Sequence, residues 1–323
     1  MKLYPLKFTP ILKERLWGGT KLKSVLHKNI QSDITGESWE LSAVPGAISE
    51  VSNGELAGRN LQELMNLHGA DLLGKSVLER FGTTFPILIK FIDAKQDLSI
   101  QLHPNDALAK ERHNSFGKTE MWYVMDADKD ASLIVGFNKP ITKAEYEASL
   151  ANNTLVDVMN YEKVTEGDTF FINTGKIHAI GAGVLLAEIQ QTSDVTYRVF
   201  DFNRKDKEGK LRELHTEPAL DAIDFEFKDD FSVAYEKTMN QSNVMVDSPY
   251  FKTNYLNLDG ETFVKNTASI DSFIIYMCVS GATLLSTDTG EVKLQKGETV
   301  LVPANTNEIT FVNGAAKLLE VTI

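Results

Sequence analysis

Short apolar runs, several of them alternating with polar residues, make up most of the chain. Glycine, asparagine and aspartate separate them. Evenly spaced short strands of this kind are typical of a β-sandwich or barrel. The clearest predicted strands are Phe85–Ala94, Leu98–His103, Glu120–Met125, Leu133–Phe137, Thr169–Asn173 and Val184–Gln190.

Helical periodicity is confined to two segments, Asn60–Leu73 and Thr142–Met159. Apolar residues in the first recur at three- and four-residue spacing, which predicts an amphipathic helix. Each segment begins with a residue that caps helices well, Asn60 or Thr142, and a glutamate follows three positions later. We expect both helices to be insertions on a β framework.

Two segments of the chain are similar to each other. Residues 164–173 parallel residues 294–303, each with a glycine and an acidic residue before a strand and a further strand after it. Two related β domains explain this economically, although such turns also recur by chance. We expect a first domain over 1–230, which holds both helical insertions, and a second over 231–323. Where the first copy has His178 the second has Glu308, and the second domain contains no histidine, so we expect a metal site only in the first.

The composition is that of an ordinary globular protein. The 323 residues are 42% hydrophobic and 24% charged, enough to form two cores without disulfide or metal support, so a bound metal would be functional. The only cysteine, Cys278, lies in an apolar run, which predicts a buried thiol and a reducing compartment. The N-terminus lacks the features of a signal peptide, and no run is long enough to span a membrane, so we expect a cytoplasmic protein without membrane partners.

The net charge of −12 constrains the partner. An acidic chain without a dense Lys/Arg cluster lacks the electrostatic basis of nucleic-acid binding. A small anionic substrate would be opposed at long range, so a few local cations would have to hold it.

Four residues could form a metal site. Gln101 and His103 project from the same face of a predicted strand, Glu120 begins another strand, and His178 follows a glycine. Two imidazoles, a carboxylate and an amide suit zinc with one position left open. Each residue alone is equally well explained as a surface group or a satisfied core group.

The spacing Gly167-x5-Asn173-x-Gly175-x2-His178 closely follows the second signature of the cupin barrel, with Asn173 in place of a proline. The chain as a whole resembles the type I phosphomannose isomerases (mannose-6-phosphate isomerases) in their short bacterial form. The matching stretches are Glu14–Gly19, Gly36–Ser42, Leu98–Asn105, Gly117–Tyr123, Gly175–Gly181 and Glu188–Val199.

The resemblance implies a fold, an activity and a cofactor. The fold is a mainly β cupin barrel (double-stranded β-helix, or jelly roll) with helical insertions, followed by a degenerate cupin-like domain that covers or buttresses the site. The activity is isomerisation between mannose 6-phosphate and fructose 6-phosphate with one Zn²⁺ per chain. Gln101, His103, Glu120 and His178 match the metal ligands and Arg198 the catalytic arginine; the Gln101 amide is either a weak ligand or a hydrogen-bond partner of one.

The resemblance also bears on four other residues. Lys118 shares a face with Glu120 and is a candidate for proton transfer, its pKa lowered by Zn²⁺ and Arg198, while a metal-bound water and His103 stay open as alternatives. Lys90, in a very apolar run, either reaches solvent or meets an anion, and with Ser99 it matches positions that contact the substrate phosphate. Asp194 matches a position near the arginine, and we expect it to orient Arg198 through an ion pair.

Three rival functions share parts of this pattern. An iron-dependent cupin oxygenase would want a second histidine at the position of Gln101 and would have no use for Lys118 or Arg198. A non-catalytic sugar-phosphate sensor would not need all four metal donors. An isomerase of another substrate, such as glucose 6-phosphate, would differ only in the shape of its cavity.

Overall fold

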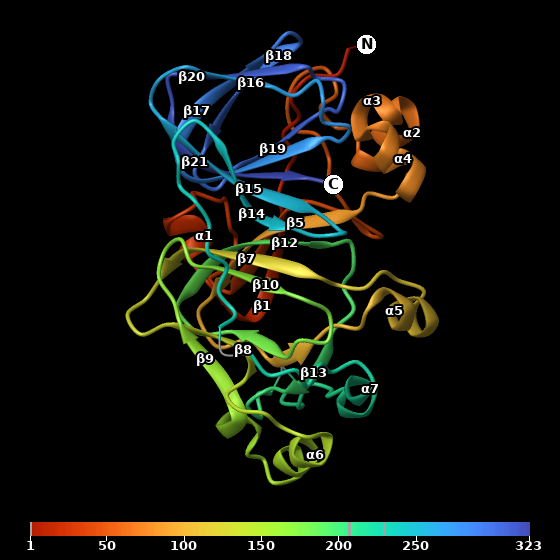
Figure 1. Cartoon of the computed structure of the whole chain (residues 1–323), viewed down its shortest axis with the longest axis vertical. Coiled ribbons are helices and arrows are strands. Elements are labelled where there is room, and N and C mark those ends of the chain that lie inside the picture. The colour runs from red at the N-terminus through yellow and green to blue at the C-terminus, as the bar shows by residue number, and fades with distance from the viewer. Residues whose placement is uncertain (1, 206–207, 229) are drawn as a thin grey trace.

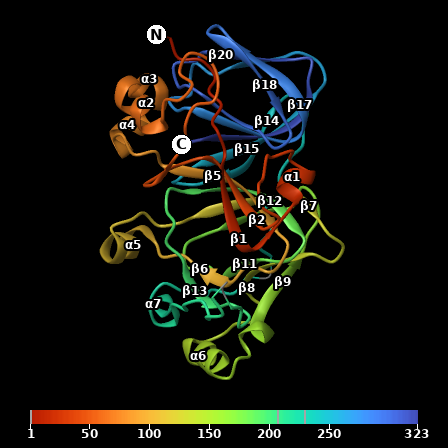
Figure 2. The same cartoon turned by 180° about the vertical axis from the view of Figure 1, so that it is seen from behind.

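The computed structural model describes residues 2–205, 208–228 and 230–323. The molecule is elongated, with the C-terminal strands at one end and the helices α6 (Lys143–Ala151) and α7 (Thr216–Leu220) at the other (Figures 1 and 2). A sheet formed by strands from the first two-thirds of the chain lies between these ends. The mainly β prediction is confirmed.

Two antiparallel sheets face each other in the first part of the chain. The central sheet has the order β1 (Ile11–Gly19), β2 (Thr35–Leu41), β5 (Ile87–Ala94), β12 (Val184–Gln191), β7 (Glu120–Ala127) and β10 (Thr169–Ile172). The facing sheet has the order β13 (Tyr197–Phe200), β6 (Ile100–Leu102), β11 (His178–Ile180), β8 (Ser132–Phe137) and β9 (Met159–Lys163). Apolar side chains from both sheets meet in one core, as in a jelly roll.

A third sheet forms the C-terminal part of the chain. Its order is β14 (Ser242–Asp247), β15 (Lys252–Asp259), β21 (Ala315–Thr322), β17 (Ile274–Thr287), β20 (Glu308–Val312) and β16 (Phe263–Asn266), and β18 (Gly290–Gln295) and β19 (Thr299–Val302) also pair with β17. A small hairpin joins β3 (Ala43–Val44) to β4 (Ala47–Ile48). The strands β19, β20 and β21 repeat the order of β10, β11 and β12 at the predicted offset, which agrees with two related β domains. The boundary near residue 230 stays a prediction.

The central sheet is buried on both faces. In β5, Ile89 and Phe91 pack in a core that includes Ile275 and Leu319 of the C-terminal sheet, whereas Ile92 packs in the core of the first barrel. This double burial explains why the predicted strand reads as a continuous apolar run rather than an alternating one. Any charged side chain on the inward face of this sheet is therefore removed from solvent.

Both predicted helices begin at the predicted cap. Asn60 Oδ1 accepts a hydrogen bond from Glu63 N at 2.9 Å, and Thr142 forms a capping box with Glu145. The first helix is interrupted at Gly69, where φ is +44°, and the second ends before Asn153, where φ is +58°, so each is shorter than predicted. The full set is α1 (Lys21–Ser24), α2 (Leu61–His68), α3 (Ala70–Leu73), α4 (Lys75–Phe81), α5 (Asp106–His113), α6, the 3₁₀ turn η1 (Leu155–Val158) and α7. None of the described helices has the length and apolar character needed to cross a membrane.

The interior of the C-terminal sheet holds a buried carboxylate, Glu320. Its side chain accepts hydrogen bonds from Tyr276 at 2.9 Å and Asn254 at 2.9 Å, and Lys265 Nζ lies 3.0 Å from Oε2. Protein donors therefore satisfy this carboxylate. Cys278 is buried in the same core, as predicted.

This ion pair generates a stability prediction. Lys265→Met leaves the Glu320 charge without its counter-ion, which should lower the free energy of unfolding by about 3 kcal/mol. The control Lys252→Met removes the exposed pair with Asp247 on the same sheet and should change it by about 1 kcal/mol or less. Urea unfolding of both variants is the measurement, and equal effects would contradict the structural role of Glu320.

Candidate metal centre

Strand register assembles one side of the site. Gln101 on β6 pairs directly with His178 on β11 and with Arg198 on β13. Residues directly opposite each other in antiparallel strands point to the same face, so all three side chains leave the sheet together. His103 follows directly after β6, and Glu120 is the first residue of β7 in the central sheet. The site is thus built from both facing sheets.

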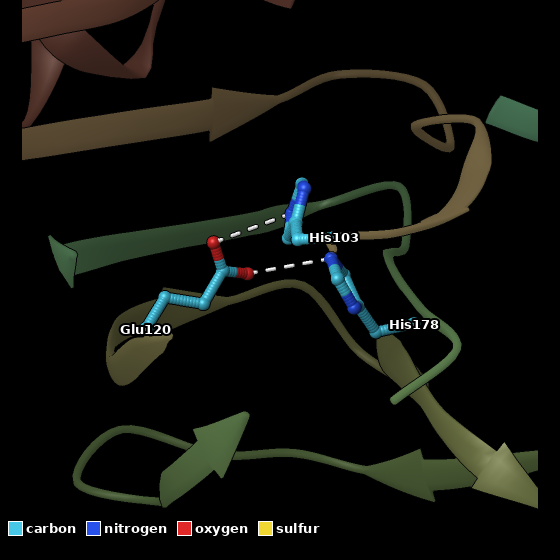
Figure 3. A group of neighbouring side chains, drawn as sticks. All are labelled: His103, Glu120 and His178. Atoms are coloured by element: carbon cyan, nitrogen blue, oxygen red, sulfur yellow. Dashed lines mark ion pairs between the residues drawn. The ribbon is translucent and has the colours of Figure 1, made fainter. Parts of the chain in front are cut away.

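Three buried side chains converge between the sheets, as Figure 3 shows. His178 Nε2 lies 3.3 Å from Glu120 Oε1, and His103 Nε2 lies 3.6 Å from Glu120 Oε2. The three ligand atoms all lie within 4.8 Å of one another. Four ligands held tetrahedrally around zinc are separated by about 3.4 Å, so two of these separations already match a metal site.

The histidines are oriented as ligands. His103 Nδ1 bonds to the carbonyl of Val195 at 2.8 Å, and His178 Nδ1 bonds to the carbonyl of Lys176 at 2.7 Å. A carbonyl can only accept, so each Nδ1 carries the proton and each Nε2 presents its lone pair to the site. Nε2 of His178 is buried without a hydrogen-bond partner among the described residues. Such an orphaned acceptor next to a carboxylate fits a bound cation.

The electrostatics favour the same conclusion. Burial lowers the pKa of His103 well below its usual value and that of His178 to about 4, so both imidazoles are neutral at physiological pH. Burial also raises the pKa of Glu120, although Lys118 opposes this shift. A bound metal ion would offset the free-energy cost of keeping the buried Glu120 carboxylate ionised. Neutral imidazoles are the form of histidine that binds metals.

Lys118 lies where the sequence predicts. It is buried, and its Nζ lies 3.2 Å from both His103 Nε2 and Glu120 Oε2. Burial lowers the pKa of Lys118, but the carboxylates of Glu120 and Glu188 outweigh burial and raise it. The expected lowering refers to the site with Zn²⁺ bound and stays a prediction. The prediction considered only the cations near Lys118 and not these two anions.

Arg198 is held differently from the prediction. Its Nε donates to Ser99 Oγ at 3.3 Å and its Nη1 donates to the carbonyl of Glu213 at 2.8 Å. No ion pair joins Asp194 to Arg198 within the described part of the chain, so the expected carboxylate–guanidinium contact is wrong. Ser99 also donates to Gln101 Oε1 at 3.3 Å, so hydrogen bonds connect Arg198 through Ser99 to Gln101.

Lys90 meets an anion rather than solvent. Its Nζ lies 2.9 Å from Glu188 Oε1, directly across from it on β12, and Trp122 Nε1 donates to Glu188 Oε2 at 3.0 Å. Burial raises the pKa of Glu188, but Lys90 and Lys118 outweigh burial and lower it. Glu188 was not singled out from the sequence, although an acidic residue in the apolar run Val184–Gln190 was a signal of the same kind as Lys90.

A polar cavity of about 430 Å³ opens beside these groups. Its charged lining comprises five cations, Arg15, Lys90, Lys118, Arg198 and Arg212, and two carboxylates, Glu37 and Asp194; Trp17, Trp39, Leu98, Ser99, Gln101 and Thr196 complete it. Arg15 and Glu37 lie in two of the stretches that match the family, but the sequence alone assigned neither a role. Arg212 belongs to no motif, so only the structure reveals it. The excess of cations suits an anionic ligand.

Comparisons with known proteins agree with this geometry. The family model "Phosphomannose isomerase type I, catalytic domain" matches residues 5–135, and "Mannose-6-phosphate isomerase, cupin domain" matches residues 240–323. The chain is 37% identical over 311 residues to mannose-6-phosphate isomerase ManA of Bacillus subtilis, covering 95% of this chain and 96% of that protein. It is 33% identical over 300 residues to the mannose-6-phosphate isomerase of Streptococcus mutans, covering 93% and 92%. A solved mannose 6-phosphate isomerase structure from Bacillus subtilis matches with a TM-score of 0.90 and 31% identity over 99% of this chain and 100% of that one.

The cluster predicts where a metal binds. His103→Ala and His178→Ala should each lose the bound metal because each removes one of the three converging ligands. Glu308→Ala, at the corresponding position of the C-terminal sheet, should keep it. Metal per chain, measured by plasma mass spectrometry on purified protein, is the test; metal loss in Glu308→Ala alone would contradict the placement of the site.

Proposed function

The chain belongs to the type I phosphomannose isomerase family, and from this premise we propose that it is a zinc-dependent aldose–ketose isomerase that interconverts mannose 6-phosphate and fructose 6-phosphate. The observation that carries the proposal is a buried His103–Glu120–His178 cluster beside a cavity lined by five cations. A sugar phosphate combines a carbonyl, which needs an electrophile, with a dianion, which needs cations. The names of the similar proteins from Bacillus subtilis and Streptococcus mutans support the same substrate.

We propose that His103, Glu120 and His178 hold one Zn²⁺, with Gln101 as a fourth ligand. Two nitrogen donors and one carboxylate are a common catalytic zinc set. Gln101 is paired in register with His178, which places its amide on the ligand side of the sheet. If Gln101 is not a ligand, its hydrogen bonds support the others. Bound zinc would polarise the substrate carbonyl as a Lewis acid.

Proton transfer requires a group that can take a proton from one carbon of the substrate and return it to the neighbouring carbon. We propose Lys118, as its neutral amine, for this role because it lines the cavity and contacts two of the metal-binding side chains. A cation bound at Glu120 would offset the carboxylate charge that raises the lysine pKa and would favour the neutral amine. Removal of the proton gives a cis-enediolate, which carries negative charge on oxygen. Arg198 is fixed by Ser99 and by a backbone carbonyl, so its remaining donors can stabilise that charge without reorganisation.

The substrate phosphate needs contacts of its own. We propose that Lys90 and Ser99 contact it and that Asp194, an exposed carboxylate of the cavity lining, binds the sugar. Glu188 neutralises most of the Lys90 charge, so further positive charge must come from elsewhere. Arg198 and Arg212 on the same cavity supply it.

The Arg198 guanidinium provides a test that separates binding from chemistry. Arg198→Ala should lower kcat for mannose 6-phosphate by roughly a hundredfold, as loss of one oxyanion donor does, while the zinc content stays that of wild type. The measurement is conversion to fructose 6-phosphate, with metal stoichiometry determined on the same samples. Chelation of the wild type should abolish the conversion, and reconstitution with zinc should restore it.

Each alternative result has a meaning. Near-normal kcat in a zinc-replete Arg198→Ala variant would refute its role. No conversion by zinc-replete wild type would refute the isomerase and favour a non-catalytic sensor. Conversion of glucose 6-phosphate instead would assign a different substrate. Oxygen consumption with bound iron would indicate an oxygenase.

Lys90 tests phosphate recognition. Lys90→Met removes a cation from the cavity and leaves Glu188 unpaired, so KM for mannose 6-phosphate should rise at least tenfold, more than any change in kcat/KM for free mannose. Thermal unfolding of the variant checks the fold. Equal losses on both substrates would assign Lys90 a purely structural role.

A further inference from the structure

The segment that leads into Glu120 lies outside the strands, and two side chains hold it in place. Residues 117–119 have no regular secondary structure, yet all three are buried. Gly117 N donates to Asp106 Oδ1 at 2.7 Å, and Thr119 N donates to Gln191 Oε1 at 2.9 Å. Gln191 Nε2 donates to the same Asp106 Oδ1 at 3.0 Å. These bonds enclose the residue between them, Lys118.

The two side chains come from rigid elements. Gln191 is the last residue of β12 and is buried, and its own backbone N also donates to the carbonyl of Thr119 at 3.1 Å. Asp106 is the first residue of α5. The segment 117–119 is therefore pinned between the central sheet and the start of α5.

The position of this segment matters because it carries Lys118, the residue proposed for proton transfer. Its long side chain reaches two metal-binding groups at 3.2 Å, and the position of its Nζ follows the position of its backbone. Loss of one enclosing bond would leave a buried peptide N–H unpaired, which destabilises this position of the segment and favours its movement. A displacement of about 1 Å in a reacting group can reduce a rate about a hundredfold.

We propose that Asp106 and Gln191 are positioning residues that set the location of Lys118 for proton transfer. The inference rests on the proposed isomerase function. Neither residue lines the substrate cavity; both line a separate cavity of about 470 Å³ on the other side of the segment, together with Tyr250 of the C-terminal part of the chain. Their effect should therefore appear in kcat and not in substrate binding.

A pair of variants tests this. Gln191→Glu keeps the acceptor for Thr119 N but places a second carboxylate against Asp106, where a donor stood. We expect kcat for mannose 6-phosphate to fall at least tenfold, with KM within twofold of wild type and zinc content unchanged. The matched variant Asp106→Asn keeps the oxygen that accepts from both Gly117 N and Gln191 Nε2, so its kcat should stay within threefold of wild type.

The control lies on the same helix. Arg112→Gln breaks an exposed ion pair between α5 and Asp221 without touching the segment, so it should keep wild-type kcat if α5 stability is not the cause. Hydrogen exchange at the amides of Gly117 and Thr119 gives a readout independent of turnover: it should accelerate at least tenfold in Gln191→Glu and stay at the wild-type rate in Asp106→Asn.

The outcomes separate this inference from the proposed function. If zinc-replete wild type isomerises mannose 6-phosphate but Gln191→Glu keeps its kcat, or Asp106→Asn loses as much kcat as Gln191→Glu, the positioning role is overturned. If wild type does not isomerise, the proposed function fails first. Should Gln191→Glu fail to fold, Asp106→Ala is the substitute: it removes the acceptor of both Gly117 N and Gln191 Nε2 and should lower kcat without changing KM, and unchanged kcat would overturn the role.

Discussion

Burial of the central sheet on both faces is the constraint on which the site depends. One face packs against the C-terminal strands and the other forms the wall of the barrel, so a charged residue on the inward side of β5, β7 or β12 is largely removed from solvent. The charged residues of this region form close ion pairs, Lys90 with Glu188 and Lys118 with Glu120. In such a medium an electrostatic contact is strong and an unpaired group is costly. Exclusion of water would destabilise an isolated carboxylate. It also strengthens the attraction between a cation and Glu120 with its two neutral imidazoles, so the cluster is suited to a metal ion.

Precision comes from strand register more than from loops. Gln101 is fixed by its neighbours on both sides, and the residues opposite it are His178, which we propose binds the metal, and Arg198, which we propose stabilises the developing charge. A one-residue slip of β6 would turn Gln101 to the other face of the sheet. Lys118 is the exception, since it lies outside regular structure and needs Asp106 and Gln191 to fix it.

Local physics made part of this predictable from the sequence. The cap at Asn60 depends on a hydrogen bond three residues away, and it formed where expected. His103, Glu120 and His178 converge because two strand patterns and a turn signature place them on facing sheets. Partners that depend on tertiary packing were missed or misassigned: Arg198 contacts the backbone of Glu213 instead of Asp194, which is nearer in sequence. Arg212 reaches the cavity from a segment without any pattern, so only the assembled fold brings it there.

The C-terminal sheet satisfies its buried carboxylate with protein groups. Where the first barrel leaves an imidazole nitrogen unpaired, the second satisfies Glu320 with Lys265, Tyr276 and Asn254. A site already saturated by protein donors offers a cation nothing further, so this domain contributes through its outer face. That face covers Ile89 and Phe91 on the outer side of β5, and Lys90 between them points inward to Glu188, so the cover helps to hold the strand that carries this pair. The stability of the second domain and the electrostatics of the first site are therefore coupled through one sheet that both share.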